Sequence, residues 1–278
     1  MVGHFKNCWN GVLHCNAIAD FTQHFQIVAA LMGFEAPKNA DTPNPVVTHA
    51  AQKALNRRKV ERALLYNPDA IALWLFQKYT HLFTPVIENT AITLPVLSVM
   101  PSVTPVCFAS MYSGLQPADH GIQAYVKPVL TCDTLFDAAI RAGHKPIIIS
   151  TEGDSISEIF KQRPMEYIFC ATPEECNRHA LEVLEKDSHD LIVVYNGNYD
   201  TQMHRTGTES AEAIAELCKN AADFERLTAA ARAAWAGKTC LAAFLPDHGC
   251  HDIDGDLGSH GLDMPEDMEI VHFYSLWK

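Results

Sequence analysis

Short, continuous runs of apolar residues recur along the chain and are separated by longer segments of mixed composition. The runs are Arg62–Asn67, Leu94–Met100, Pro146–Ser150, Tyr167–Cys170, Asp190–Tyr195, Thr239–Leu245 and Glu269–Tyr274. Each is rich in β-branched or aromatic residues and alternates little with polar residues, which is typical of parallel strands buried on both faces. We therefore predict a buried parallel strand at each run.

Helical patterns lie between these runs. Thr134–Ala142 carries apolar residues at three- and four-residue spacing, and Gly143 is placed to end it. Thr172–Lys186 opens with a Thr-Pro pair, which suits an N-cap followed by proline. The longest helix is predicted from about Ser210 to Ala236. The alternation predicts an α/β fold with a doubly wound, mostly parallel sheet flanked by helices.

The interval 1–60 has no clear strand pattern and looks helical, with a loop at Pro37–Pro45. We predict a single domain over residues 1–278, in which residues 1–60 form a helical N-terminal extension packed on the sheet. With 278 residues, the chain is long enough to bury a substantial core.

Composition narrows the function classes. The net charge of −12 argues against nucleic acid as a partner, because a phosphate backbone attracts lysine and arginine. Nine cysteines, an odd number without a CxxC pair, fit reduced thiols in a cytoplasmic protein. The start MVGHFKNCWNG lacks a signal-peptide pattern, and no segment approaches the roughly 20 apolar residues of a membrane span. We expect a cytoplasmic protein without a membrane partner, and the oligomeric state stays open.

Polar residues with metal-binding chemistry follow several predicted strands. They are Asp69 in YNPDAIALW, Asp200 and His204 in NGNYDTQMHRTG, Asp247 and His248 in PDHG, and His260 in GSHG. Carboxylate and neutral imidazole suit Zn²⁺ or Mn²⁺. One such residue alone more often caps a helix or lies on the surface. Their concentration at the carboxyl ends of strands, where sheets of this class bind ligands, indicates a metal site.

Thr104 precedes an apparent helix after the second run. A hydroxyl at a helix N-terminus lies near free backbone N–H groups, which can hold an anionic oxygen. Beside a metal its proton is lost more easily, so that it becomes a usable nucleophile. The ordinary alternative, a simple helix cap, is compatible with this role.

Four segments in series resemble the alkaline phosphatase superfamily, in particular its nucleotide pyrophosphatase/phosphodiesterase and phosphonoacetate hydrolase branch. PSVTPVCFASMYSGLQPADHGI resembles the nucleophile segment, and YDTQMHRTG resembles the Asp-x-x-x-His-x-x-Gly element. PDHG resembles Ser-Asp-His-Gly, and GSHG with MPEDMEIVHFY resembles the closing element. Order and spacing agree over roughly residues 60–278. The resemblance implies an alkaline phosphatase-like three-layer sandwich, with Thr104 in the nucleophile position.

The resemblance also implies two divalent metal ions, most often zinc, with Mn²⁺ also suited. Asp200, His204 and His260 would hold one ion. Asp247, His248 and an aspartate after the first strand would hold the other. The segment YNPDAIALW offers either Asn67 or Asp69 for that last ligand. We favour Asp69, because a carboxylate binds a dication better than an amide does.

One departure concerns substrate binding. The phosphodiesterase branch usually has an asparagine three residues after the nucleophile, where this chain has Cys107, a poor hydrogen-bond donor. By its position Cys107 is still predicted to contact the substrate. Arg205, Lys127 and Tyr125 are candidates to replace it as the second anchor of the phosphoryl group.

The sequence therefore predicts a two-metal hydrolase of phosphate esters, phosphodiesters or phosphonates, acting on a small phosphorylated or phosphonate substrate. A phosphomutase on the same scaffold and a degenerate member that binds metal or ligand without turnover remain alternatives. A dinucleotide-binding module is disfavoured, because no GxGxxG follows a strand.

Other tempting residues have ordinary interpretations. We expect surface or packing roles for His4, His14, His24 and His49, and loop support from His120. We expect Asp154, near Glu152, to begin a helix. The run His251, Asp252, Asp254 and Asp256 lacks the continuation of a calcium-binding loop, so we expect it to decorate the loop before His260.

Overall fold

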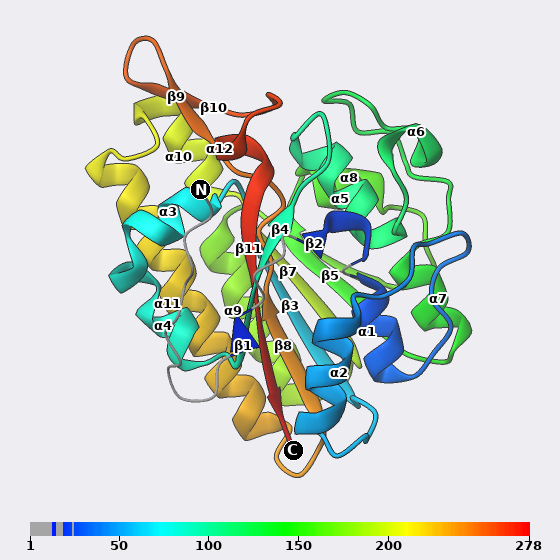
Figure 1. The fold of residues 1–278 in the computed structure, drawn as a ribbon. Coiled ribbons are helices and arrows are strands. Elements are labelled where there is room, and N and C mark those ends of the chain that lie inside the picture. The colour runs from blue at the N-terminus through cyan, green and yellow to red at the C-terminus, as the bar shows by residue number, and fades with distance from the viewer. Residues whose placement is uncertain (1–12, 15–18, 24) are drawn as a thin grey trace.

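The computed structural model describes residues 13–14, 19–23 and 25–278 (Figure 1). Within them, nine strands form one sheet with the order β1-β4-β11-β8-β3-β7-β5-β6, and β2 also pairs with β4. The strands of this sheet are β1 (Leu13–His14), β2 (Ala19–Asp20), β3 (Arg62–Pro68), β4 (Ile92–Leu97), β5 (Pro146–Thr151), β6 (Glu166–Cys170), β7 (Leu191–Asn196), β8 (Cys240–Phe244) and β11 (Glu269–Trp277). The separate hairpin consists of β9 (His251–Ile253) and β10 (Leu257–Ser259). All seven predicted strands are therefore present in the sheet.

The direction of β11 differs from the prediction of a parallel strand. It pairs antiparallel with both β4 and β8, whereas the other pairs of the described sheet are parallel. A parallel strand needs a crossover of a dozen or more residues, usually a helix. Between β8 and β11 the chain forms only the hairpin and α12 (Pro265–Met268), so it enters β11 from the edge at which β8 ended.

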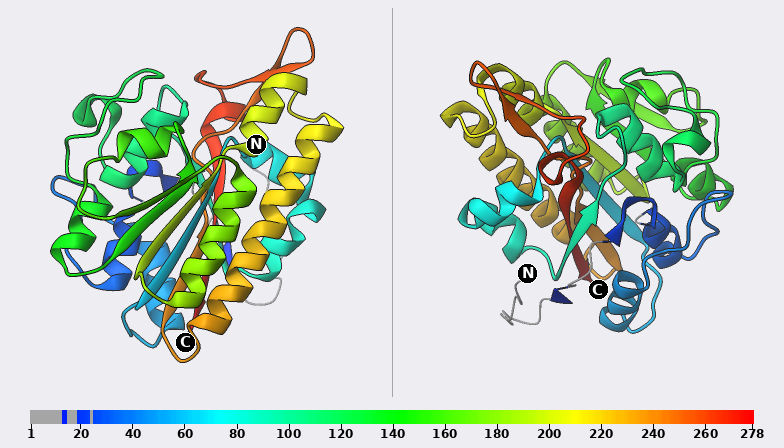
Figure 2. Two further views of the ribbon diagram at one scale, coloured as in Figure 1. Left: turned by 180° about the vertical axis from the view of Figure 1, so that it is seen from behind. Right: turned by 45° about the horizontal axis from the view of Figure 1, so that its top comes forward.

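Helices cover both faces of the sheet (Figures 1 and 2). One layer contains α1 (Phe25–Met32), α2 (Pro45–Ala54), α5 (Thr104–Ser113), α6 (Pro117–His120), α7 (Leu135–Arg141) and α8 (Ser155–Ile159). The other contains α3 (Leu73–Lys78), α4 (Thr84–Glu88), α9 (Pro173–Lys186), α10 (Asn198–Thr206) and α11 (Ala211–Ala234). The predicted α/β sandwich, with a mostly parallel sheet between two helical layers, is confirmed.

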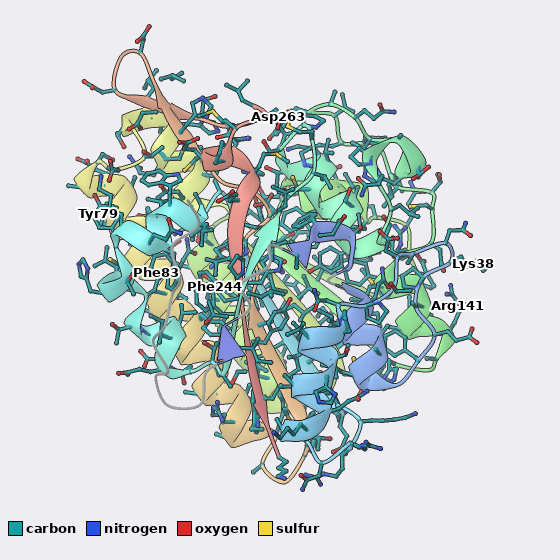
Figure 3. The ribbon with its side chains drawn as sticks, viewed as in Figure 1. Lys38, Tyr79, Phe83, Arg141, Phe244 and Asp263 are labelled. Atoms are coloured by element: carbon teal, nitrogen blue, oxygen red, sulfur yellow. The ribbon has the colours of Figure 1, made fainter. Side chains whose placement is uncertain are left out.

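Two apolar cores explain why the strand sequences do not alternate. Along β3, Ala63 and Leu65 belong to the core beneath α5, and Leu64 and Tyr66 belong to the core beneath α11. In the second core, Phe244 of β8 meets Phe83 of η2 (Thr80–Phe83) at a ring-centroid distance of 6.5 Å (Figure 3). Because both faces of each strand are buried, both sets of residues must be apolar.

The interval 1–60 contains the helices α1 and α2 but also β1 and β2, which add to the edge of the sheet beside β4. Two-residue strands are too short to produce a recognisable pattern, so the sequence prediction omitted them. His49 of α2 is exposed, whereas His4 and His24 lie outside the described residues. In the described part of the chain, no helix is long and apolar enough to cross a membrane.

Candidate active site

Loops from four strands and the β9–β10 hairpin converge at the carboxyl edge of the sheet, at the top in Figure 1. The contributions are Asp69 after β3, Thr104 at the start of α5 after β4, Asp200 and His204 on α10 after β7, Asp247 and His248 after β8, and His260 after β10. Parallel strands bring their carboxyl ends to one edge. This explains why residues far apart in sequence meet here.

The α10 cluster consists of Asp200, His204 and His260. Asp200 and His204 are four residues apart on α10 and share one face of that helix. Asp200 Oδ1 lies 3.2 Å from His204 Nε2 and 3.3 Å from His260 Nε2. The hairpin packs closely on α10, since a Cβ at Gly258 would lie 2.4 Å from Met203 Sδ.

The β3/β8 cluster consists of Asp69, Asp247 and His248, all fully buried. His248 Nε2 lies 3.3 Å from Asp69 Oδ1 and 3.4 Å from Asp247 Oδ2. The His248 ring stacks on that of His260 at 4.1 Å between centroids, so the two clusters are neighbours.

The three histidines share one orientation. In each, Nδ1 lies within hydrogen-bond distance of a backbone carbonyl oxygen, to which an Nδ1–H group donates. The pairs are His204 with Gly258 at 2.9 Å, His248 with Gly249 at 2.9 Å and His260 with Ser102 at 3.0 Å. This arrangement leaves Nε2 of each ring directed at the carboxylates, as in histidines that ligate metals.

Three carboxylate oxygens are placed where a cation could bind them. Asp69 Oδ1, Asp200 Oδ1 and Asp247 Oδ2 are buried without a hydrogen-bond partner, and they are the same oxygens that face the Nε2 atoms. A buried, unpartnered carboxylate oxygen is costly. A divalent cation between carboxylate and imidazole would satisfy both, and this donor set suits Zn²⁺ or Mn²⁺.

The pKa shifts within the site also fit a bound cation. Burial, followed by the charge of Asp200, raises the pKa of Asp69 to about 7. Burial and the nearby Asp69 raise the pKa of Asp247 well above its usual value. The carboxylate of Asp200 beside Nε2 raises the pKa of His204 to about 9, whereas burial lowers the pKa of His248. Without a cation, protons must take up part of the negative charge.

Metal addition is expected to stabilise the protein, and more so at higher pH. Above about pH 6.5, unfolded Asp69 is ionised and unfolded His204 is neutral, while both hold protons in the folded metal-free protein. The folded state therefore loses protons as the pH rises to about 8.5, and metal-free stability falls. With Zn²⁺ at about 100 times its Kd, stabilisation of about 2.7 kcal/mol should raise Tm by roughly 5–10 °C.

Thermal unfolding with and without Zn²⁺ or Mn²⁺, at about pH 6.5 and about pH 8.5, tests this expectation. His49→Gln replaces an exposed histidine of α2 and should keep the full shift. His204→Gln should lose part of it. Equal Tm values with metal and with chelator, at both pH values, would contradict the metal site.

Thr104 is the first residue of α5 and is 3% exposed. Its hydroxyl lies 3.2 Å from His248 Nε2 and 3.4 Å from Asp69 Oδ2. Val103 occupies the N-cap position, and no side-chain hydrogen bond caps the helix there. The hydroxyl is thus directed at the ligand clusters instead of capping α5.

The choice between Asn67 and Asp69 has a geometric answer. The amide of Asn67 is buried and donates to the hydroxyl of Tyr112 at 3.1 Å, away from both clusters. Asp69, two residues later, lies beside Asp247 and His248. The structure therefore brings Asp69, and not Asn67, into the β3/β8 cluster.

The predicted substrate contacts divide into two groups. Tyr125 and Lys127 line a cavity of about 350 Å³ together with Asp69 and Asp200. Cys107 is buried, with its thiol 3.3 Å from the hydroxyl of Ser98. Arg205 is exposed on α10 and does not line the cavity. Of these four residues, Tyr125 and Lys127 line the cavity, and Cys107 and Arg205 do not.

Sequence reasoning missed Tyr195, which lines the cavity and donates a hydrogen bond to Asp69. It ends an apolar strand, so its sequence position resembles that of any core aromatic residue. Asp154 is the N-cap of α8, as expected, and also lines the cavity.

Several expected supporting roles agree with the contacts. His120 lies 2.9 Å from the hydroxyl of Ser110 and accepts from the N–H of Ile122. His251 pairs with Asp267 at 2.7 Å, away from both clusters. Asp252 accepts hydrogen bonds from Thr208. The dense polar stretch before His260 is thus a hairpin held by contacts with Thr208 and Asp267 on neighbouring segments.

The sheet order, the two helical layers and the position of the site define an alkaline phosphatase-like α/β sandwich. No family model and no curated protein matches this sequence. Among solved structures, human ectonucleotide pyrophosphatase/phosphodiesterase 5 is similar with a TM-score of 0.59 at 14% identity, over 76% of this chain and 87% of that one. The murine protein gives 0.59 at 14% identity, over 77% and 88%.

Phosphonoacetate hydrolase from Sinorhizobium meliloti, in complex with phosphonoacetate, is similar with a TM-score of 0.51 at 15% identity. The match covers 70% of this chain and 59% of that one. Both kinds of neighbour bear the names of the two groups that the sequence motifs resemble, and the fold that the resemblance implies is confirmed. At these identities the likeness establishes a shared fold.

Proposed function

We propose that this protein is a metal-dependent hydrolase of phosphate esters, phosphodiesters or phosphonates, with Thr104 as the nucleophile. One observation carries the proposal. The hydroxyl of Thr104 lies at the end of α5 that borders the β3/β8 cluster. The three ligand atoms of that cluster lie within 4.8 Å of one another, and so do the three ligand atoms of the α10 cluster. A nucleophile beside two cation sites is the arrangement that in-line phosphoryl transfer requires.

The residues of the chain have distinct roles in the proposed mechanism. Two divalent cations, held by the two clusters, would neutralise charge on the phosphoryl oxygens and make a nearby hydroxyl more acidic. The oxygen of Thr104 attacks phosphorus as the leaving group departs on the opposite side, giving a phosphothreonine. Water then cleaves the P–O bond to Thr104 and restores the hydroxyl.

The cavity supports a small substrate. Its volume of about 350 Å³ is within the range of small-molecule sites. Four acidic side chains and one lysine line it, namely Asp69, Asp154, Asp200, Glu216 and Lys127. Without cations such a wall would repel a phosphate, so anionic substrates require the metals. The solved neighbours include complexes with AMP, phosphonoacetate and phosphonoformate.

A substrate screen tests the proposal and separates its alternatives. Protein loaded with Zn²⁺ or Mn²⁺ should hydrolyse at least one of bis-p-nitrophenyl phosphate, p-nitrophenyl phosphate and phosphonoacetate, and a chelator should abolish the activity. In ¹⁸O-labelled water the released phosphorus product should carry the label. An unlabelled product with phosphoryl transfer to an acceptor would identify a phosphomutase. Metal binding without turnover of any substrate would identify a degenerate member.

A further inference from the structure

Tyr195 is placed by the strand register to reach Asp69. It is the penultimate residue of β7, and in the parallel pair with β3 it lies opposite Asn67. Asp69 is two residues further along the chain, which is about 6.6 Å in an extended strand. The length of a tyrosine side chain bridges this distance, and the Tyr195 hydroxyl donates to Asp69 Oδ2.

The position of this hydroxyl is fixed by its surroundings. Tyr195 is 4% exposed, and its ring meets Phe108 of α5 edge to face at 5.3 Å between centroids. Gly197 closes the other side, since a Cβ there would lie 2.9 Å from the Tyr195 hydroxyl. Phe108 and Gly197 therefore flank the ring, and a side chain at position 197 would displace it.

The contact makes the two oxygens of Asp69 unequal. Oδ2 accepts from Tyr195 and faces the Thr104 hydroxyl at 3.4 Å. Oδ1 is buried without a hydrogen-bond partner, 3.3 Å from His248 Nε2. A carboxylate free to rotate would present either oxygen. With Tyr195 in place, Oδ1 is the oxygen left for a cation.

We propose that Tyr195 is a positioning residue for the metal of the β3/β8 cluster, holding Asp69 so that Oδ1 faces the ion. The inference rests on the metal-binding part of the proposed function. Hydrogen-bonding partners of metal ligands orient them, and their removal typically lowers metal affinity by about 10–100-fold. Neither the composition nor the sequence motifs assign Tyr195 such a role.

The test is the metal affinity of Tyr195→Phe, which keeps the ring and removes the hydroxyl. Zn²⁺ titration by calorimetry, with chelator competition for tight sites, should show one of two dissociation constants raised by about 10–100-fold. The other, from the α10 cluster, should stay within about threefold. Tyr167→Phe is the matched control. Tyr167 lies on β6, and its hydroxyl donates to the carbonyl oxygen of Phe160 instead of to a ligand carboxylate. This variant should leave both constants unchanged.

Gly197→Ala provides an independent variant that keeps the hydroxyl but displaces it. It should lower the affinity of the β3/β8 cluster for its ion. The double variant Tyr195→Phe/Gly197→Ala should lose little more than either single variant, because both remove one interaction. If Tyr195→Phe fails to fold, Gly197→Ala alone decides the matter.

Unchanged Zn²⁺ constants in folded Tyr195→Phe would overturn the inference. A lowered kcat with unchanged metal affinity would also overturn it, since the hydroxyl would then act on the substrate. Wild-type protein that binds two ions but hydrolyses nothing would refute the proposed hydrolase and leave the Tyr195 inference standing. Wild-type protein that binds no metal would refute both.

Discussion

Replacing Thr104 by alanine is expected to lower turnover by roughly 10⁴–10⁶-fold, the scale on which covalent hydrolases respond to loss of catalytic groups. The variant removes a hydroxyl that lies 3.2 Å from His248 Nε2 and 3.4 Å from Asp69 Oδ2. It leaves all six ligand side chains in place, so metal content should not change. The measurement is kcat on the best substrate of the screen, together with metal analysis of the same sample.

Two further variants separate chemistry from structure. Thr104→Ser retains a hydroxyl and should retain part of the activity. Thr134 also stands at a helix N-terminus, as the N-cap of α7, but its hydroxyl donates to Asp137 and contacts neither ligand cluster. Thr134→Ala should cost about 1 kcal/mol of stability without lowering kcat. If Thr104→Ala hydrolyses bis-p-nitrophenyl phosphate as fast as the wild type, Thr104 is not the nucleophile.

The covalent mechanism makes an additional demand on the same variants. Wild-type protein quenched during turnover should carry phosphate on the peptide that contains Thr104, detectable by mass spectrometry. Thr104→Ala should carry none. Phosphate on another residue of wild-type protein would show that this residue, and not Thr104, is the nucleophile. The covalent reaction class would still stand.

Much of the fold was predictable because β3, β5, β7 and β8 are buried on both faces. Successive residues serve two different cores, so the strands read as continuous apolar runs. The site residues were predictable for a related reason. Parallel strands end at a common edge, so polar residues after them meet whatever their distance in sequence.

What the sequence could not supply depends on three-dimensional neighbours. The direction of β11 is set by the edge of the sheet at which the chain enters the strand, and no local sequence pattern encodes that edge. Tyr195 acquires its role only through the register of β7 on β3. The position of Cys107, three residues after Thr104, predicts a substrate contact, but its thiol is buried beside Ser98 and does not line the cavity.

Asp200→Asn is expected to have the second largest effect, because one carboxylate oxygen serves two histidines. Asp200 Oδ1 lies 3.2 Å from His204 Nε2 and 3.3 Å from His260 Nε2, and it is buried without a hydrogen-bond partner. An amide has the same size but lacks the charge that a dication requires. Since loss of a ligand's partner alone costs about 10–100-fold in affinity, loss of the ligand should cost more than about 100-fold.

Metal analysis of Asp200→Asn should therefore show one ion in place of two, with kcat lowered at least in proportion to the lost occupancy. A second readout does not involve metal. The carboxylate of Asp200 beside Nε2 raises the pKa of His204 to about 9, so in metal-free Asp200→Asn the pKa of His204, followed by NMR, should fall toward its usual value. Asp254→Asn removes the same charge from an exposed position in the β9–β10 turn and should change neither readout. Retention of two ions with wild-type affinity in Asp200→Asn would show that the α10 cluster does not bind metal through this carboxylate. An ion bound by His204 and His260 would then need a different third ligand.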